Sequence, residues 1–486
     1  MTAAAPASPP VATSGAAEGA LTSCDHFERL AEALCRTDLT ELRGVGADRV
    51  ALSLSCEESE FIRFNHARVR QATQVRQGRA VLSVMRGQRR IEGAVSLTGD
   101  VALDIARLRH EAAALGAELP AVPDDPHLLL CPPDRHSKRE TAGRLPSAAE
   151  VVSRVAEACA GRGSGGDADF VGIHAAGPVA RAYADSTGSR HWHRSDSFHL
   201  DWCLYAPGTE PALRDKAVKS SLAGSEWSAD AFLRKVDDGL RQLPLLREPP
   251  RRLEPGRYRA AFSTAAMAEL LETLAWSGFS ARDRQHGTSS LVMLAGPGAV
   301  GDGLQAMDQR VTISEASVDA GTPLFTATGF VKPARVSLVE RGRNAGVLTS
   351  ARTAQEYGLA ANGADEYEAP DALRLEPGAL PAADLLKALD TGLYVSNLWY
   401  LNYSDRNACR MTGMTRFACF WVEGGRLVAP LAVMRFDDSM LRMLGPGLVA
   451  LTDEAERLPD AGTYGGRQLS SVTTPAAIVA DFTLTL

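Results

Sequence analysis

The sequence predicts an α+β protein with at least two domains. Between residues 49 and 99, short runs alternate apolar and polar residues, as in an antiparallel β meander. In residues 101–118, apolar residues instead recur at helical spacing: Leu103, Ile105, Leu108, Ala112 and Leu115. A chain of 486 residues also exceeds the size at which a single hydrophobic core stops growing.

The N-terminal half combines this meander with helices. We expect a disordered tail over residues 1–23, since it is rich in Ala, Pro, Ser and Gly and has no apolar periodicity. Turn pairs divide the meander into five strands: Asn65-His66, Gln77-Gly78 and Gly87-Gln88 separate the clearest of them. Further helices are predicted over 25–35 and 147–160, and the glycine-rich segment 161–167 is predicted to be flexible and to mark an internal boundary.

The C-terminal half is predicted to be mostly strands and turns. It begins after the prolines at 249 and 250, so the predicted domains are 24–248, with a central segment 163–248, and 249–486. A strand over 258–262 leads into a helix over 264–277. The stretch 391–441 then reads as an aromatic strand, a polar loop over 402–415, and two strands joined at Glu423-Gly424-Gly425.

Composition excludes several classes of protein. Apolar content of 45% and charged content of 23% are ordinary for a globular chain, and a net charge of −7 argues against a dedicated nucleic-acid binder. The eight cysteines form no CxxC pair, so we expect reduced thiols. No apolar run is long enough to cross a bilayer and no signal peptide is recognisable, so the expected location is the cytoplasm.

Three stretches resemble a known family. They are LWYLNYSDRNACRMTGMTRFACFWVEGGRLVAPLAVMRFDDSMLRML, VKPARVSLVERGRNAGVLTSARTAQEYGLAANG and SEFIRFNHARVRQATQVRQGRAVLSV, and they are similar to the TldD/PmbA (modulator of DNA gyrase) family, best to its PmbA (TldE) branch. The resemblance implies an N-terminal α/β domain with an antiparallel sheet and a β-rich, partly barrel-like C-terminal domain. It also implies pairing of a zinc-bearing TldD-type subunit with a metal-free TldE-type subunit, around a cavity that admits unfolded peptide.

The metal motif of the TldD branch is missing. That branch carries a helical HExxxH, in which two imidazoles bind the metal and the glutamate polarises water. The corresponding helix here has Glu269 but no histidine until His286. His110-Glu111 lacks a second histidine one turn on. We therefore expect no cofactor in this chain and zinc in a TldD-type partner, with Glu269 as a weak catalytic candidate that is more simply a surface charge.

One segment offers an alternative metal site. If residues 189–205 form one strand, His191, His193, His199, Asp201 and Cys203 share a face, and His-x-His on a strand suits zinc. The polar run 194–197 instead predicts a turn, which leaves His191 and His193 on a water-facing strand. Cys409 and Cys419 lack histidine partners and are predicted to be structural.

The polar loop is the predicted substrate site. Tyr400, Asn402, Asp405, Arg410 and Arg416 have the groups to hydrogen-bond a peptide backbone or its carboxylate. The alternative is that they cap turns and pair with each other.

Three functions follow from these observations. The first is a metal-free TldE-type subunit, inactive alone, that guides unfolded peptide to a TldD-type metallopeptidase partner. The second is a stand-alone peptide-binding protein without protease activity. The third is a metallopeptidase whose metal site involves His191 and His193. Nucleic acid and membranes are not expected partners.

Overall fold

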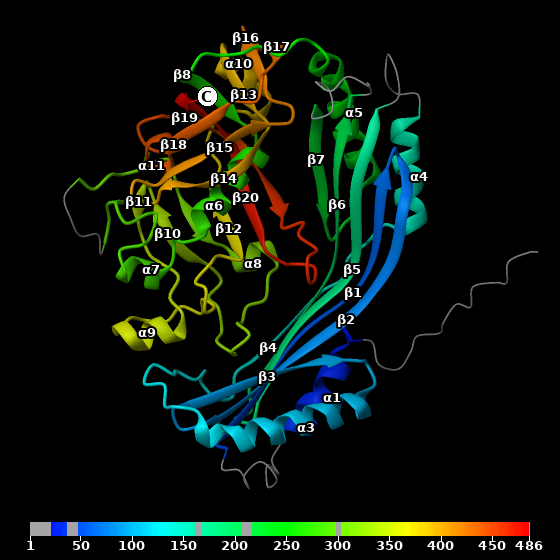
Figure 1. The fold of residues 1–486 in the computed structure, drawn as a ribbon, viewed down its shortest axis with the longest axis vertical. Coiled ribbons are helices and arrows are strands. Elements are labelled where there is room, and N and C mark those ends of the chain that lie inside the picture. Colours follow the sequence, from blue (N-terminus) through cyan, green and yellow to red (C-terminus); the bar gives the residue numbers. More distant parts are fainter. Residues whose placement is uncertain (1–20, 36–46, 161–167, 207–215, 298–302, 486) are drawn as a thin grey trace, which may run out of the picture.

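A computed structural model describes residues 21–35, 47–160, 168–206, 216–297 and 303–485, and these form two β-sheets flanked by helices (Figure 1). Most of the predicted tail and the whole segment 161–167 lie outside the described residues. Within the described part of the chain, no helix has both the length and the apolar character needed to span a membrane.

The first sheet uses only strands from the N-terminal half. Its order is β3-β2-β1-β5-β6-β4, with β7 paired to β6, and all neighbours are antiparallel except β4 and β6. The strands are β1 Arg49–Asn65, β2 Arg68–Arg86, β3 Arg89–Leu97, β4 His136–Thr141, β5 Asp169–Asp185, β6 Arg190–Tyr205 and β7 Ala217–Gly224.

Four helices cover one face of this sheet. In Figure 1, α1 and α3 lie at its lower end and α4 and α5 at its upper end. Alternate residues of the strands, such as Leu52 of β1 and Leu200 of β6, pack in the cores beneath these helices. The residues between them therefore point to the opposite face, toward the C-terminal half. The helices are α1 Cys24–Cys35, α3 Val101–Glu118, α4 Ala148–Cys159 and α5 Ala229–Leu246, with a 3-10 turn at Leu119–Ala121.

The meander is confirmed, but its strands are longer than predicted. β1 and β2 each run through what the sequence divides into two strands, and Gly78 lies in the middle of β2, paired with Cys56. A Cβ at Gly78 would lie 3.1 Å from the Cys56 sulfur and 3.2 Å from Leu97. The glycine thus serves close packing rather than a turn.

The second sheet is built from the C-terminal half. Its main path runs β11-β10-β9-β12-β20-β8-β13-β16-β17, with β14, β15, β18 and β19 attached at the side. Over the described strands this path does not close on itself. The predicted class, α+β with a β-rich and partly barrel-like C-terminal half, is confirmed. The strands are β8 Gly256–Phe262, β9 Ile313–Glu315, β10 Val336–Glu340, β11 Arg343–Asn344, β12 Ala372–Leu375, β13 Gly392–Val395, β14 Asn397–Asp405, β15 Arg410–Arg416, β16 Phe420–Glu423, β17 Arg426–Pro430, β18 Arg435–Ser439, β19 Leu448–Pro459 and β20 Ser471–Leu484.

Helix α6, Thr264–Ala275, packs against β20 and β14 of this sheet. Ser263 caps it by accepting a hydrogen bond from the amide of Ala266 at 3.1 Å. Met267, Leu270, Leu271 and Leu274 are at most 1% exposed, so the predicted apolar stripe lies in the core. The other helices are short: α7 Ala281–Gln285, α8 Ser317–Ala320, α9 Ala351–Tyr357, α10 Leu385–Leu389, α11 Met440–Met443 and a 3-10 turn at Ala382–Asp384.

A buried arginine joins the two halves. Arg467, on the segment between β19 and β20, is 3% exposed and reaches the free face of the first sheet. Its guanidinium donates to the carbonyl oxygens of Gly177 at 2.9 Å and Ser197 at 2.8 Å. Its backbone amide donates to Glu57 at 2.8 Å. Burial lowers the pKa of Arg467 to about 10, so it remains a cation at neutral pH.

Candidate functional site

A cavity of about 490 Å³ lies between the two halves, and we call it the central cavity. Its walls come from β6, β7 and α5 of the N-terminal half and from α6, β13, β14 and β19 of the C-terminal half. The polar side of α6 borders it through Glu269 and Glu272. The helix that the sequence resemblance equates with the metal-motif helix of the TldD branch therefore faces a space of ligand size.

The carboxylate of Glu269 is hydrogen-bonded within this wall and is not a surface charge. The simpler sequence interpretation is therefore wrong. One carboxylate oxygen accepts a hydrogen bond from the backbone amide of Leu398 at 2.6 Å, and the other accepts from the side chain of Asn397 at 3.1 Å. Lys219 lies 3.7 Å away. Burial raises the pKa of Glu269 despite these partners. The carboxylate thus fixes the start of β14 against α6.

Glu272, one turn further on, has neither hydrogen bond nor ion pair to any described residue. Its side chain is accessible to solvent, but the walls of the cavity displace bulk water around it. This desolvation, followed by the repulsion of Glu269 and Asp460, raises the pKa of Glu272 to about 7.

Asp201 of β6 and Asp460 from the end of β19 face the same cavity. Desolvation raises the pKa of Asp201 to about 6, and its Oδ2 atom is buried without a partner among the described residues. Asp460 accepts a hydrogen bond from the amide of Gly462 at 2.7 Å. The central cavity thus concentrates carboxyl groups from three separate elements.

The residues present do not fit a zinc ion. Helix α6 has no imidazole, and His286 lies beyond α7, hydrogen-bonded to Tyr357 at 2.8 Å. Among the residues that the structure describes, no three His, Cys, Asp or Glu side chains are grouped so that they can hold a metal ion. His110, in α3, is exposed at a distant part of the fold.

The histidine strand differs from its prediction in two ways. β6 is continuous from Arg190 to Tyr205, so the expected turn at 194–197 is absent. Its histidine face is buried rather than water-facing, since His191 and His193 are at most 1% exposed. His191 hydrogen-bonds Ser137 at 2.8 Å and stacks on Phe325 from the C-terminal half. Burial lowers the pKa of His193 to about 4, which keeps it neutral.

The predicted polar loop is mostly a pair of strands. β14 and β15 pair directly, and only residues 406–409 lie between them. Asp405 accepts a hydrogen bond from the amide of Ala408 at 3.1 Å, and Asn402 accepts one from Tyr403 at 2.8 Å. Arg410 pairs with Asp437.

The other two predicted residues differ in exposure, since Arg416 is half-buried and Tyr400 is exposed. Arg416 lies over the rings of Trp399 and Phe417, and Tyr400 is 79% exposed. None of the five predicted substrate residues lines the central cavity, although Asn397 from the same strand does. Both cysteines of this region, Cys409 and Cys419, are buried.

Lys219, Glu272 and Asp460 were not predicted as site residues, and Asp201 was named only on the histidine face of its strand. Glu272 was visible as the second acid of α6. For Asp460 no pattern in the sequence signals a role.

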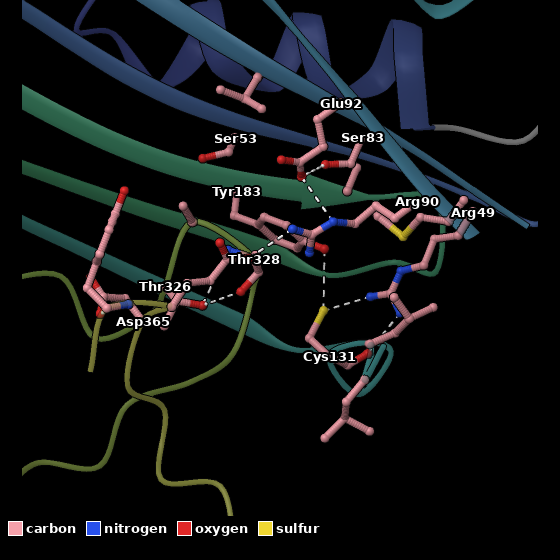
Figure 2. A pocket seen from close by; sticks show the side chains of 18 residues that line it. Arg49, Ser53, Ser83, Arg90, Glu92, Cys131, Tyr183, Thr326, Thr328 and Asp365 are labelled. Atoms are coloured by element: carbon pink, nitrogen blue, oxygen red, sulfur yellow. Dashed lines mark hydrogen bonds and ion pairs between the residues drawn. The ribbon is translucent and has the colours of Figure 1, made fainter. Parts of the chain in front are cut away.

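A second cavity, of about 250 Å³, lies beside Arg49 and Tyr183, and we call it the arginine cavity (Figure 2). Arg49 pairs with the buried Asp185 at 2.5 Å. Arg90 pairs with Glu366 at 2.8 Å and lies 3.4 Å from Glu92. Because each of its arginines already has a carboxylate partner, the arginine cavity is the weaker candidate for a charged ligand.

Comparison with known proteins agrees with this geometry. Residues 255–486 match the model of the PmbA/TldA metallopeptidase C-terminal domain. No curated protein matches the chain.

Solved structures share the fold. TldE from Thermococcus kodakarensis superposes with a TM-score of 0.74 at 12% identity, covering 95% of this chain and 100% of that one. Proteins described as modulators of DNA gyrase from Thermotoga maritima and Bacteroides thetaiotaomicron give a TM-score of 0.72 each, at 14% and 15% identity, with 95% of this chain and 99% of each covered. These identities show a common fold for the chain as a whole. Its C-terminal part, residues 255–486, is similar to the PmbA/TldA metallopeptidase C-terminal domain.

Proposed function

We propose that this chain is the metal-free, peptide-binding subunit of a two-chain TldD/TldE-type metallopeptidase. In this role it holds unfolded peptide in the central cavity, and a zinc-bearing TldD-type partner cleaves it. We also propose a domain boundary near Pro249, because every strand of the first sheet precedes it and every strand of the second sheet follows it.

One observation carries the proposal. Helix α6 borders the central cavity, but it presents two glutamates and no imidazole there. A site of this composition retains the means to hold a polar ligand and lacks the means to activate water on zinc. Glu269 cannot act as a free base in this arrangement, since both of its oxygens accept hydrogen bonds.

Peptide cleavage with and without a partner tests the proposal. The purified chain is expected to leave an unfolded peptide intact, and a TldD-type protein from the same source is expected to cleave it faster when this chain is added. Stimulation should depend on the amount of this chain and saturate at a fixed ratio. Peptide binding without any stimulation would favour the stand-alone binding protein.

Elemental analysis of the same preparation separates the remaining alternative. Less than a stoichiometric amount of zinc is expected, because no described group of side chains fits the ion. About one tightly held zinc per chain would contradict the proposal, and His191 and His193 would then be the first ligands to replace.

A further inference from the structure

We propose that the central cavity selects peptide segments that carry a lysine or arginine side chain, which it receives between Asp201, Glu272 and Asp460. This inference rests on the proposed function, because it assigns the kind of peptide that the same cavity holds. It follows from the balance of charge in the cavity walls and from the way these charges are paired.

The cavity walls carry more negative than positive groups. The carboxylates are Asp201, Asp238, Glu269, Glu272, Glu456 and Asp460, and the ammonium groups are Lys219 and Lys235. Such an excess of negative groups attracts cations and repels anions.

Three of the carboxylates already have cationic partners. Lys235 lies 2.7 Å from Glu456, Lys219 lies 3.7 Å from Glu269, and Arg241 pairs with Asp238. Lys219 also attracts Asp201 and Glu272, but its ion pair is with Glu269, and two lysines are too few for six carboxylates.

The other three carboxylates, Asp201, Glu272 and Asp460, make no ion pair with any described residue. They come from β6, α6 and the end of β19, so elements of both halves bring them to one space. Because all three line one cavity, Asp460 repels each of the other two, and this repulsion helps to raise the pKa of both. A single cation among them would relieve this repulsion.

The shape of the cavity favours a peptide side chain over a bare ion. The described His, Cys, Asp and Glu side chains form no metal-ligand group. About 490 Å³ is within the range of sites that bury small organic ligands. Ala265, Ala268, Leu458 and Pro459 line the same walls. They offer apolar contact to the aliphatic stem of lysine or arginine, while the charged end meets the carboxylates.

Three matched peptides test the inference on the full-length chain. They are short, acetylated, fluorescently labelled and unstructured, and they differ only at one central residue: lysine, norleucine or glutamate. Fluorescence anisotropy is expected to give the lysine peptide a Kd roughly tenfold lower than that of the glutamate peptide, with norleucine between them. The lysine preference should weaken as salt is raised.

Substitutions of single carboxylates test which residues cause the preference for the lysine peptide. Glu272→Gln and Asp460→Asn are each expected to reduce the ratio of lysine to glutamate affinity by about threefold to tenfold. Glu340→Gln removes a carboxylate that lines neither the central nor the arginine cavity, and it is the matched control. Circular dichroism of each variant confirms folding, and the three peptides still decide the question on the unmodified chain if a variant does not fold.

The outcomes separate the two proposals. Equal binding of all three peptides would overturn the selectivity and leave the proposed function intact. A lysine preference that survives in Glu272→Gln and Asp460→Asn would overturn the assignment to these carboxylates. No measurable binding of any peptide would count against the proposed function itself.

Discussion

The arginine cavity and the central cavity are both enclosed by the two halves of the chain, but they handle charge in opposite ways. In the arginine cavity, Arg49 and Arg90 each contact a carboxylate. In the central cavity, Glu272 and Asp201 have no cationic partner among the described residues. Paired charges hold neighbouring segments in place, whereas unpaired charges cost stability and remain available to a ligand. The contrast is the reason that we propose the central cavity, and not the arginine cavity, as the binding site.

The largest expected effect is in the arginine cavity. Arg49→Ala leaves Asp185 buried without its ion pair, so the free energy of unfolding should fall by about 3–5 kcal/mol. Burial alone would raise the pKa of Asp185, but hydrogen bonds from Thr187 and Arg49 lower it overall, so the carboxylate is ionised in the folded chain. Urea denaturation measures the change.

The control for this substitution is Arg86→Ala, at an exposed position of β2, where a change within about 0.5 kcal/mol is expected. If both substitutions lowered the free energy of unfolding by the same amount, the Arg49–Asp185 pair would have no special role in stability. The distinction between the two cavities would then fail.

A second prediction compares two neighbouring acids of α6. Glu269→Ala removes the acceptor for Asn397 and for the amide of Leu398, so the free energy of unfolding should fall by about 1–3 kcal/mol. Glu272→Ala removes a carboxylate without partners and should destabilise the chain less or not at all. Thermal melting of both variants at neutral pH gives the comparison, and a larger loss for Glu272→Ala would reverse their roles.

A third prediction concerns pH and stability. Glu272 titrates near 4.5 in an unfolded chain and at about 7 in the folded one. Between these values the folded chain holds the extra proton, so this residue lowers stability as the pH rises through the window. Glu272→Gln cannot ionise. It should therefore melt at a higher temperature than the unmodified chain near pH 8, and at the same temperature below about pH 4.5.

Other ionisable groups face Glu272 across the same cavity. They are Asp201 on β6, Lys219 on β7, Asp238 and Lys235 on α5, Glu269 on α6, Tyr394 on β13, Glu456 on β19 and Asp460 after it. The measured quantity is therefore the difference between variant and unmodified chain at each pH. If the difference in melting temperature did not change with pH, the pKa of Glu272 would not be raised in the folded chain.

The smallest expected effect is at the predicted substrate residues of the β14–β15 hairpin, which line neither the central nor the arginine cavity. Arg416 lies over the exposed ring of Trp399 and the half-buried ring of Phe417, so Arg416→Ala should change stability by about 1 kcal/mol. If the hairpin guides peptide, Arg416→Ala should lower cleavage by the complex by less than tenfold. Arg410→Ala loses only a half-exposed ion pair with Asp437, so the complex that contains it should cleave peptide at the normal rate. If the complex with Arg416→Ala cleaved peptide at the unchanged rate, the hairpin would not guide peptide.

Local patterns in the sequence predicted much of the fold. Helix α3 has the predicted bounds, and the turn at Gly424 and Gly425 has the positive φ angles expected of a hairpin. The turn predictions were wrong where a residue contacts a segment that is distant in the sequence. Gly78 resembles a turn residue but admits the Cys56 sulfur, and Ser197 resembles part of a turn but accepts hydrogen bonds from Arg467.

The candidate site was harder to predict than the fold. The resemblance identified α6 as the helix to inspect, and its two glutamates do line the central cavity. Asp201 and Asp460 come from opposite halves of the chain, and only the packing of one sheet against the other brings them together. The burial of the His193 face has the same origin, because alternation along a strand cannot tell water from a neighbouring domain.

Arg467 also sets an order for biosynthesis. The carbonyl of Gly177 leaves the ribosome 290 residues before the guanidinium that binds it, and at about 5–20 residues per second the delay is about 15–60 s. Through that interval the N-terminal sheet has its strands but lacks the cation that bridges them. The central cavity also needs Asp460 for its wall, so it forms only after this late segment has been synthesised, and a shorter nascent chain has no finished cavity.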